Sequence, residues 1–364
     1  MIHVVTIPEF EKSNHMQNNY LIIMAGGVGS RFWPMSTAQK PKQFLDILNV
    51  GQTMLQQTVE RFKHCCPMSN VFVVTSEKYK ALVKEQVPKL DDSQILLEPC
   101  MRNTAPCIAY AVWKIKKRNP NANIVVSPSD HLVVNIQEFE RVIKQGLDFT
   151  AHNDALLTLG IKPHKPETGY GYIKQVSEVG TSTSEIKKVE AFKEKPTLEL
   201  AKEYVANGNY YWNSGIFLWS ATAIEKAIRN YLPKLANIFD TLAPSLDEAK
   251  EHEAIQQHFP TCPNISVDYG IMEHAPNIYV YPSDFGWSDM GTWGSLHELA
   301  LKTNEANVLK GNIHTFDTSD SIIRIDNNKK VVVQGLKGYI VVETNEALLI
   351  CQRKEEQRIK EFQS

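Results

Sequence analysis

The most informative stretch of this chain is Leu21-Ile-Ile-Met-Ala-Gly-Gly-Val-Gly-Ser-Arg-Phe-Trp-Pro34. Its apolar start runs into Gly26, Gly27 and Gly29, which is typical of a buried strand that ends in a tight loop. Glycines leave backbone N–H groups uncovered, and a nest of such groups can bind phosphate. The alternative is that the glycines only shape a turn. The Rossmann fingerprint would need a glycine at Phe32, and no Gly-Lys-Ser/Thr is present, so a dinucleotide oxidoreductase and a Walker-type NTPase are disfavoured.

Strand-like and helix-like segments alternate around this loop. The expected strands are 21–24, 71–74, 94–97, 124–126 and 156–159, and the expected helices are 53–62, a segment from 77, 104–117 and 138–148. This alternation predicts an α/β fold, a doubly wound and mostly parallel sheet with helices on both faces. Beyond residue 160 the pattern loosens, with strands expected at 170–174, 187–192 and 215–219 and helices at 198–205 and 221–231.

Residues 311–350 differ from the rest of the chain. Short β-rich runs (322–325, 331–333, 339–342 and 347–350) alternate there with Asp, Asn and Gly turns, which predicts a small all-β unit. A length of 364 residues is typical of about two domains. We therefore expect an N-terminal extension (1–15), a main α/β domain (16–305) and a small β-rich C-terminal domain (306–364).

The composition argues against several classes of protein. Lys and Arg number 39 and Asp and Glu 41, a net charge of −2, which disfavours binding to nucleic acid through an overall basic surface. No apolar run approaches the ~20 residues that a bilayer requires, and the first 15 residues do not read as a secretory signal. Six cysteines make no disulfide framework. We expect a cytoplasmic protein without a nucleic-acid or membrane partner.

Positive charge follows directly behind the glycine loop. Arg31 stands two residues past Gly29, and Lys40 and Lys42 lie within reach if the loop folds back. The bidentate fork of an arginine and the point charge of a lysine together suit a polyphosphate. The alternative is that Lys40 and Lys42 form a solvated surface pair.

A series of motifs resembles the signature of the sugar nucleotidyltransferases, specifically the mannose-1-phosphate guanylyltransferases. The motifs lie in collinear order and cover about residues 20–300: 26–36, 41–45, 98–106, 127–131, 167–173, 192–196, 212–215 and 286–291. Phe32 and Met35 stand where leucines are expected, and Cys107 where an alanine is expected. The resemblance implies a Rossmann-like nucleotidyltransferase fold with a C-terminal β-helix-like domain. The isomerase domain fused to some members is missing, so isomerase activity is not implied.

The same resemblance implies transfer of GMP from GTP to α-D-mannose 1-phosphate, with Mg²⁺ as cofactor. The attacking phosphate is already largely dianionic at neutral pH, so no general base is required. Asp130 follows an expected strand at the edge where doubly wound sheets bind ligands, and the resemblance places Asp289 opposite it. The structural alternatives are a helix cap for Asp130 and a turn for Asp289.

The candidate site residues fall into three groups that match the motifs. The catalytic candidates are Arg31, Lys42, Asp130 and Asp289, with the two aspartates as metal ligands. The nucleotide-binding candidates are Gly26, Gly27, Gly29, Ser30, Arg31, Lys42, Glu98, Asn103 and Thr104, where Glu98 is a candidate acceptor for guanine N–H groups. The sugar-phosphate candidates are Gly169, Gly171, Glu194, Lys195 and Asn213.

Three other functions stay open at this point. One is the same chemistry with another hexose 1-phosphate or another NTP. The others are an inactive relative that senses nucleotide sugars, which would be expected to lose one of the four catalytic candidates, and the disfavoured oxidoreductase. The sequence leaves the oligomeric state open, including a homodimer.

Overall fold

The computed structural model describes residues 16–27, 29–176, 185–326 and 328–363. The predicted N-terminal extension, 1–15, lies outside the described residues. The described chain divides into two compact units, and each is described here by itself. Unit 1 comprises residues up to 26, 58–129 and 133–287, and unit 2 comprises 27–57, 130–132 and the residues from 288 onward. The predicted domain boundary near 305 stays a prediction.

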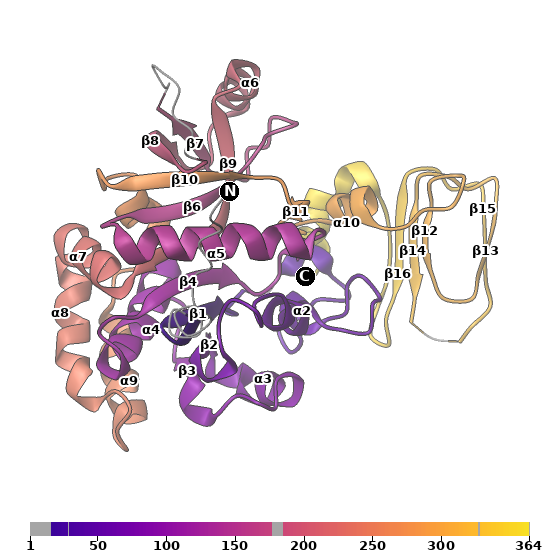
Figure 1. Ribbon diagram of the computed structural model, residues 1–364. Coiled ribbons are helices and arrows are strands. Elements are labelled where there is room, and N and C mark those ends of the chain that lie inside the picture. The colour runs from indigo at the N-terminus through magenta and orange to yellow at the C-terminus, as the bar shows by residue number, and fades with distance from the viewer. Residues whose placement is uncertain (1–15, 28, 177–184, 327, 364) are drawn as a thin grey trace, which may run out of the picture. The chain divides into compact units, whose positions relative to one another are not determined.

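A nine-stranded sheet runs through unit 1 in the order β3-β2-β1-β4-β9-β6-β10-β8-β7 (Figure 1). Its strands are β1 (Asn19–Met24), β2 (Val71–Ser76), β3 (Ile95–Glu98), β4 (Asn123–Pro128), β6 (Leu156–Ile161), β7 (Tyr172–Gln175), β8 (Lys187–Lys193), β9 (Tyr210–Ser220) and β10 (Ile278–Ser283). β1 pairs in parallel with β2 and β4, and β6 pairs in parallel with β10. The predicted doubly wound, mostly parallel sheet is confirmed. Two of its strands run opposite to their neighbours, β9 between β4 and β6 and β8 between β10 and β7.

Helices cover both faces of this sheet. On β9, Phe217 and Trp219 belong to the same core cluster as the apolar side chains of α4 (Thr104–Arg118). Leu218, between them, points the other way and lies close to Gly146 of α5 (Ile136–His152). Because successive side chains of a strand point to opposite faces, α4 and α5 pack on opposite sides. α7 (Ala221–Tyr231) and α8 (Pro233–Leu242) join α4 on its side.

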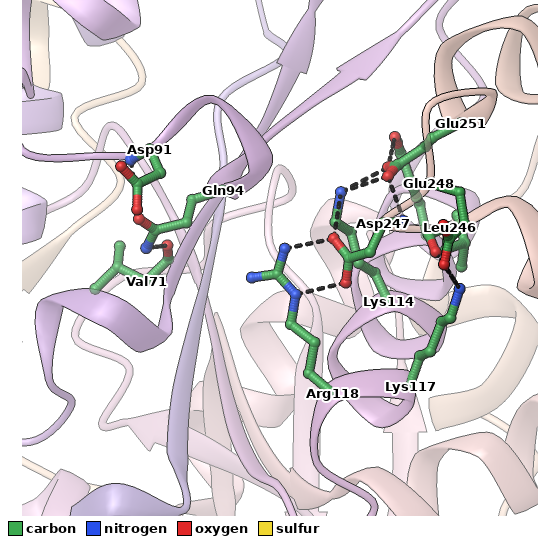
Figure 2. Close-up of polar contacts among 11 residues, drawn as sticks. Val71, Asp91, Gln94, Lys114, Lys117, Arg118, Leu246, Asp247, Glu248 and Glu251 are labelled. Atoms are coloured by element: carbon green, nitrogen blue, oxygen red, sulfur yellow. Dashed lines mark hydrogen bonds and ion pairs between the residues drawn. The ribbon is translucent and has the colours of Figure 1, made fainter.

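The C-terminal end of α4 is held by a charged network (Figure 2). The buried ammonium of Lys114 binds both carboxylate oxygens of Glu251, at 2.7 and 2.6 Å, and lies 3.2 Å from Asp247. Arg118 donates from Nε to the Asp247 carboxylate at 2.6 Å. Basic side chains in a last helical turn also complement the negative end of the helix dipole. The network fixes the helix whose first turn carries the nucleotide candidate Thr104.

Short strands, most of them parallel, build the C-terminal part of unit 2 (Figure 1). They are β12 (Val308–Lys310), β13 (Ile313–Phe316), β14 (Ile322–Ile325), β15 (Val331–Gln334), β16 (Tyr339–Glu343) and β17 (Leu348–Gln352). β12, β14 and β16 pair in parallel, β13 pairs in parallel with β15, and β17 closes antiparallel to β16. These strands confirm the predicted β-rich unit. A 3-10 helix, η9 (Arg353–Gln363), ends it and was not predicted, because its sequence is mostly charged and has few apolar residues.

The core of unit 2 joins residues from distant parts of the sequence. Phe32, Met290 and Trp293 are fully buried in one cluster with Ile340 and Ile359. The loops that carry the catalytic candidates are therefore packed on the β-rich part of the same unit.

The remaining elements are shorter helices, strands and turns of the two units. They are α2 (Met54–Arg61), α3 (Lys80–Gln86), β5 (Leu132–Val133), α6 (Leu198–Asn207), α9 (Glu251–His258), β11 (Trp287–Ser288) and α10 (Trp293–Leu299), together with a π-helix at Asp268–Met272 and short 3-10 turns. Of the helices that the structure describes, none is long and apolar enough to cross a membrane. All six cysteines are free thiols.

Candidate active site

The glycine loop turns sharply where unit 2 begins. Gly29 has a φ of +67°, in the left-handed region that side chains disfavour, and the 3-10 turn Ser30–Phe32 follows it. A Cβ added at Gly29 would lie 2.5 Å from the Cβ of Lys42. The amide of Gln43 donates to the Gly27 carbonyl at 2.9 Å. Gly29 is thus required by its own backbone and by the close approach of Lys42, before any ligand is considered.

Lys42 is the most constrained of the catalytic candidates. It is 2% exposed, and its ammonium lies 3.1 Å from the Asp130 carboxylate. The same ammonium donates to the backbone carbonyl of Asp289 at 2.8 Å and lies 5.7 Å from the centre of the Phe32 ring. The alternative of a solvated surface pair is wrong for Lys42, whereas Lys40 is exposed. Lys42 joins the two segments that carry the predicted metal ligands.

Asp130 stays ionised at neutral pH. Burial on its own raises the pKa of this carboxyl, but the charges of Lys42 and His131 outweigh burial and the pKa is lowered. The His131 ring nitrogen lies 4.0 Å from the carboxylate, and the side chain of Asp130 keeps 33% of its surface exposed. An ionised and partly exposed carboxylate is able to bind a cation. The other predicted ligand, Asp289, accepts a hydrogen bond from the Gly291 N–H at 2.9 Å, a local turn contact.

A hollow of about 250 Å³ in unit 2 brings all four catalytic candidates together. Its lining consists of Gly29, Ser30, Arg31, Lys42, Asp130, His131, Asp289, Gly291 and Lys360. Two carboxylates, with phosphate oxygens and water completing the shell, are a donor set that Mg²⁺ accepts. Within the described ranges, no group of three or more His, Cys, Asp or Glu side chains could hold a metal by itself. The residues therefore fit a metal that is bound jointly with a substrate phosphate.

Two nucleotide candidates of unit 1 lie together at the end of β3 and β1. Glu98 is buried, its Oε1 has no hydrogen-bond partner among the described residues, and its Oε2 lies 3.6 Å from where a Cβ of Gly26 would stand. Burial raises the pKa of Glu98 to about 7, although a hydrogen bond with the Cys107 thiol acts to lower it. Glu98 thus offers an unsatisfied acceptor, which is what guanine N–H groups require.

Asn103 and Thr104 form the start of α4. The Asn103 side chain accepts from the Thr104 N–H at 2.9 Å, and the Thr104 hydroxyl accepts from the Val267 N–H at 2.9 Å. Asn103 also has a φ of +68° and a ψ of −174°, a backbone conformation that residues other than glycine rarely adopt. Both residues shape the helix start, and their part in nucleotide binding stays a prediction.

Four of the five sugar-phosphate candidates gather around Gly171 in unit 1. The Gly171 carbonyl accepts from the Asn213 N–H at 2.8 Å, and a Cβ on Gly171 would lie 2.3 Å from the Glu194 carboxylate. The Lys195 ammonium lies 3.4 Å from Glu194, on a side chain that is 57% exposed. Gly169 instead contacts Glu167, to which it donates at 3.4 Å.

Asp268 was missed by the sequence analysis and lies in this group. Its carboxylate accepts from the Asn213 side-chain amide at 2.8 Å, and the amide oxygen of Asn213 accepts from Thr158 at 3.0 Å. Burial, with the charge of Glu194, raises the pKa of Asp268 to about 7. Glu273 also joins the group by accepting from the Glu194 N–H at 3.2 Å. A single aspartate at a helix start gives no sequence signal, because most such residues are solvated.

Comparisons with known proteins show what this chain is similar to. The family model for nucleotidyl transferases matches residues 20–306, and that for the MannoseP isomerase/GMP-like beta-helix domain matches residues 311–362. The chain is 37% identical to the mannose-1-phosphate guanylyltransferase of Escherichia coli K12, over 94% of this chain and 72% of that protein. It is 36% identical to mannose-1-phosphate guanylyltransferase ManC of Salmonella typhimurium, with the same coverage.

A solved structure shares the fold along nearly the whole chain. It is described as a mannose-1-phosphate geranyltransferase from Thermus thermophilus and superposes with a TM-score of 0.83 at 28% identity, covering 95% of this chain and 98% of that one. The two family models, the curated relatives and the shared fold agree with one another. The chain belongs to the nucleotidyl transferase family, in the group of the mannose-1-phosphate guanylyltransferases.

Proposed function

We propose that this enzyme transfers GMP from GTP to α-D-mannose 1-phosphate, giving GDP-mannose and pyrophosphate. The observation that carries the proposal is the hollow lined by Arg31, Lys42, Asp130 and Asp289. The curated relatives named mannose-1-phosphate guanylyltransferases support the choice of substrates.

The chemistry needs positioning and charge neutralisation more than proton transfer. A phosphate monoester has a second pKa near ~6, so the attacking oxygen of the sugar phosphate is already ionised at neutral pH. It attacks the α-phosphorus of GTP in line, and the bond to the pyrophosphate oxygen breaks. The protein lowers the barrier by holding the groups in line and by neutralising charge on the phosphoryl group and on the departing pyrophosphate.

Lys42 and Arg31 have different parts in this scheme. Lys42 is held by Asp130 and by the Asp289 carbonyl, so it serves as a fixed point charge that holds the phosphates and orders the two acidic segments. Arg31 lines the hollow without an ion pair to any carboxylate that the structure describes, so its fork is available to the departing pyrophosphate. Charge that is already in place costs no reorganisation as the transition state forms.

We propose Mg²⁺ as the divalent metal that this family generally uses. Asp130 and Asp289 would hold it. When bound, it supplies positive charge to the phosphate oxygens.

We further propose that residues of unit 1 select the base and the sugar. Glu98 would accept from guanine N–H groups, and the Gly26 backbone would approach the nucleotide. Lys195 would pair with the sugar phosphate, while Glu194 and Asn213 would bind sugar hydroxyls.

Two finer points complete the proposal. The enzyme would work in the cytoplasm, which is consistent with its six free thiols. A homodimer is a further proposal, tested by light scattering of the purified protein.

The function is tested by incubating the purified protein with each NTP and each hexose 1-phosphate and measuring pyrophosphate release. We expect GTP with mannose 1-phosphate and Mg²⁺ to give the highest kcat/KM. A higher kcat/KM for another pair would assign the enzyme to a different substrate, and no release with any pair would favour an inactive relative.

A further inference from the structure

The last helix of the chain reaches the catalytic hollow. Lys360 of η9 lines it together with Arg31, Lys42, Asp130 and Asp289. Neither the motifs nor the expected strands of the C-terminal domain pointed to this residue. The β-rich domain therefore contributes a charged side chain to the wall of the proposed phosphate site.

Contacts on several sides hold η9 against the loops of the site. The Gln363 amide donates to the Ser30 carbonyl at 2.6 Å, next to Arg31. The Glu356 carboxylate accepts from the Gly294 N–H at 2.7 Å, a few residues past Asp289. Ile359, adjacent to Lys360, is fully buried in the core of unit 2. The backbone that carries Lys360 is thus anchored to both loops, and only its flexible side chain extends toward the hollow.

Two positively charged side chains at the hollow, Arg31 and Lys360, are not neutralised by a carboxylate of the described residues. Of the lysine and arginine side chains that line the hollow, only Lys42 forms an ion pair with a carboxylate among the described residues. His131, which also lines the hollow, lies 4.0 Å from the same carboxylate, that of Asp130. Arg31 and Lys360 form no ion pair with any residue in the described ranges, although carboxylates lie on the same wall. Two unpaired cations facing one hollow repel each other unless an anion lies between them. An anion with several charges, such as a polyphosphate chain, matches this arrangement.

We propose that Lys360 binds the β- and γ-phosphates of GTP and, after transfer, the pyrophosphate. This inference rests on the proposed function and deepens it, because it makes the C-terminal helix a part of the active site. A solvated surface lysine is the alternative, and it predicts that Lys360 behaves like any other lysine of η9.

The test compares Lys360→Gln with Lys360→Arg and with the control Lys354→Gln. Lys354 is exposed on the same helix and does not line the catalytic hollow, so its variant removes the same charge from the same element. Pyrophosphate binding is measured by titration calorimetry with Mg²⁺ present, and the KM values for GTP and mannose 1-phosphate are measured in parallel. Folding is checked by thermal unfolding.

We expect Lys360→Gln to weaken pyrophosphate binding and raise the KM for GTP about three- to tenfold, as for one partly exposed charged contact. The KM for mannose 1-phosphate should change little. Lys360→Arg should restore pyrophosphate binding. The difference in pyrophosphate affinity between the wild type and Lys360→Gln should shrink in high salt, because exposed charges are screened. Lys354→Gln should match the wild type.

The inference is overturned if Lys360→Gln and Lys354→Gln bind pyrophosphate equally well, or if Lys360→Arg is as weak as Lys360→Gln. A wild-type protein that makes no GDP-mannose but shows the expected order of pyrophosphate affinities would refute the proposed function and leave the anion site standing. Normal turnover without that order would refute the anion site alone.

Discussion

Replacing Gly29 by alanine should damage the enzyme in two separable ways. The alanine would have to adopt a φ of +67°, which costs about 1–2 kcal/mol in the left-handed region. Its Cβ would also lie 2.5 Å from the Cβ of Lys42, whereas carbon atoms in contact prefer ~3.5–4.0 Å. The loop and Lys42 must therefore separate by about 1 Å.

That displacement reaches the catalytic charges. A shift of about 1 Å would lengthen the contacts of Lys42 with Asp130 (3.1 Å) and with the Asp289 carbonyl (2.8 Å) beyond hydrogen-bond range. Together with the backbone strain we expect Gly29→Ala to lower the free energy of unfolding by about 2–4 kcal/mol. We expect kcat to fall about 100-fold, the cost typical of a 1 Å misplacement.

Two other glycines of unit 2 separate these effects. Gly51 has a φ of +81° and open space around its missing Cβ, so Gly51→Ala should lose only the ~1–2 kcal/mol of backbone strain and keep kcat. Gly27 has neither a left-handed backbone nor a neighbouring atom within 4 Å of its missing Cβ. Gly27→Ala should therefore leave the stability unchanged and raise the KM for GTP, because the added methyl group would contact the bound nucleotide and no protein atom.

Urea unfolding and steady-state kinetics of the three variants decide the matter. The reasoning is refuted if Gly29→Ala is no less stable than Gly51→Ala and turns over at the wild-type rate. A normal KM for GTP in Gly27→Ala would show that the nucleotide does not approach this backbone.

Three further predictions concern the acidic residues and the sugar end. Asp130→Asn and Asp289→Asn should each abolish most turnover at limiting Mg²⁺, measured as pyrophosphate release, and full activity would show that the carboxylates are wrongly assigned. The pKa of Asp268 is raised to about 7, so the folded protein holds this proton more tightly than the unfolded chain and stability falls as the pH rises from about 4 to about 7. Asp268→Asn should reduce that fall and leave the part due to Glu98, whose pKa is also raised to about 7. Urea unfolding at several pH values detects the change, and an unchanged pH profile would contradict it. Lys195→Ala should raise the KM for mannose 1-phosphate about ten- to 100-fold and that for GTP much less, while Asn213→Ala should relax discrimination against glucose 1-phosphate. Equal losses for both ligands would mean that unit 1 does not hold the sugar in this way.

The elements near the glycine loop were predictable because their sequence pattern is local. An apolar run that ends in glycines predicts β1 and its loop, and the strands and helices that alternate after it predict the doubly wound sheet. The strand β10 and the helix η9 were not predicted. The apolar run of β10 is short and ends at Pro282. The helix η9 has few apolar residues, so its position depends on the buried Ile359 and on hydrogen bonds to distant loops.

The identities of the catalytic candidates came from the sequence, whereas their environments came from the fold. Arg31, Lys42, Asp130 and Asp289 were singled out as residue types that suit phosphate and metal chemistry. Nothing in the spacing shows that Lys42 is buried, or that it bridges Asp130 and the Asp289 carbonyl, since these contacts join residues 88 and 247 positions away from it. Burial and long-range pairing depend on packing that no short pattern encodes.

The class of fold, the strand that ends in the glycine loop, and the family could all be inferred from the amino-acid sequence, because buried strands, glycine turns and collinear motifs are local features. Only the tertiary structure decided that Asp268 joins Asn213 and that Lys360 of the last helix lines the catalytic hollow. A single aspartate or lysine is ordinary on any surface, and it acquires a role only when the chain folds and sets its charge beside groups from distant segments.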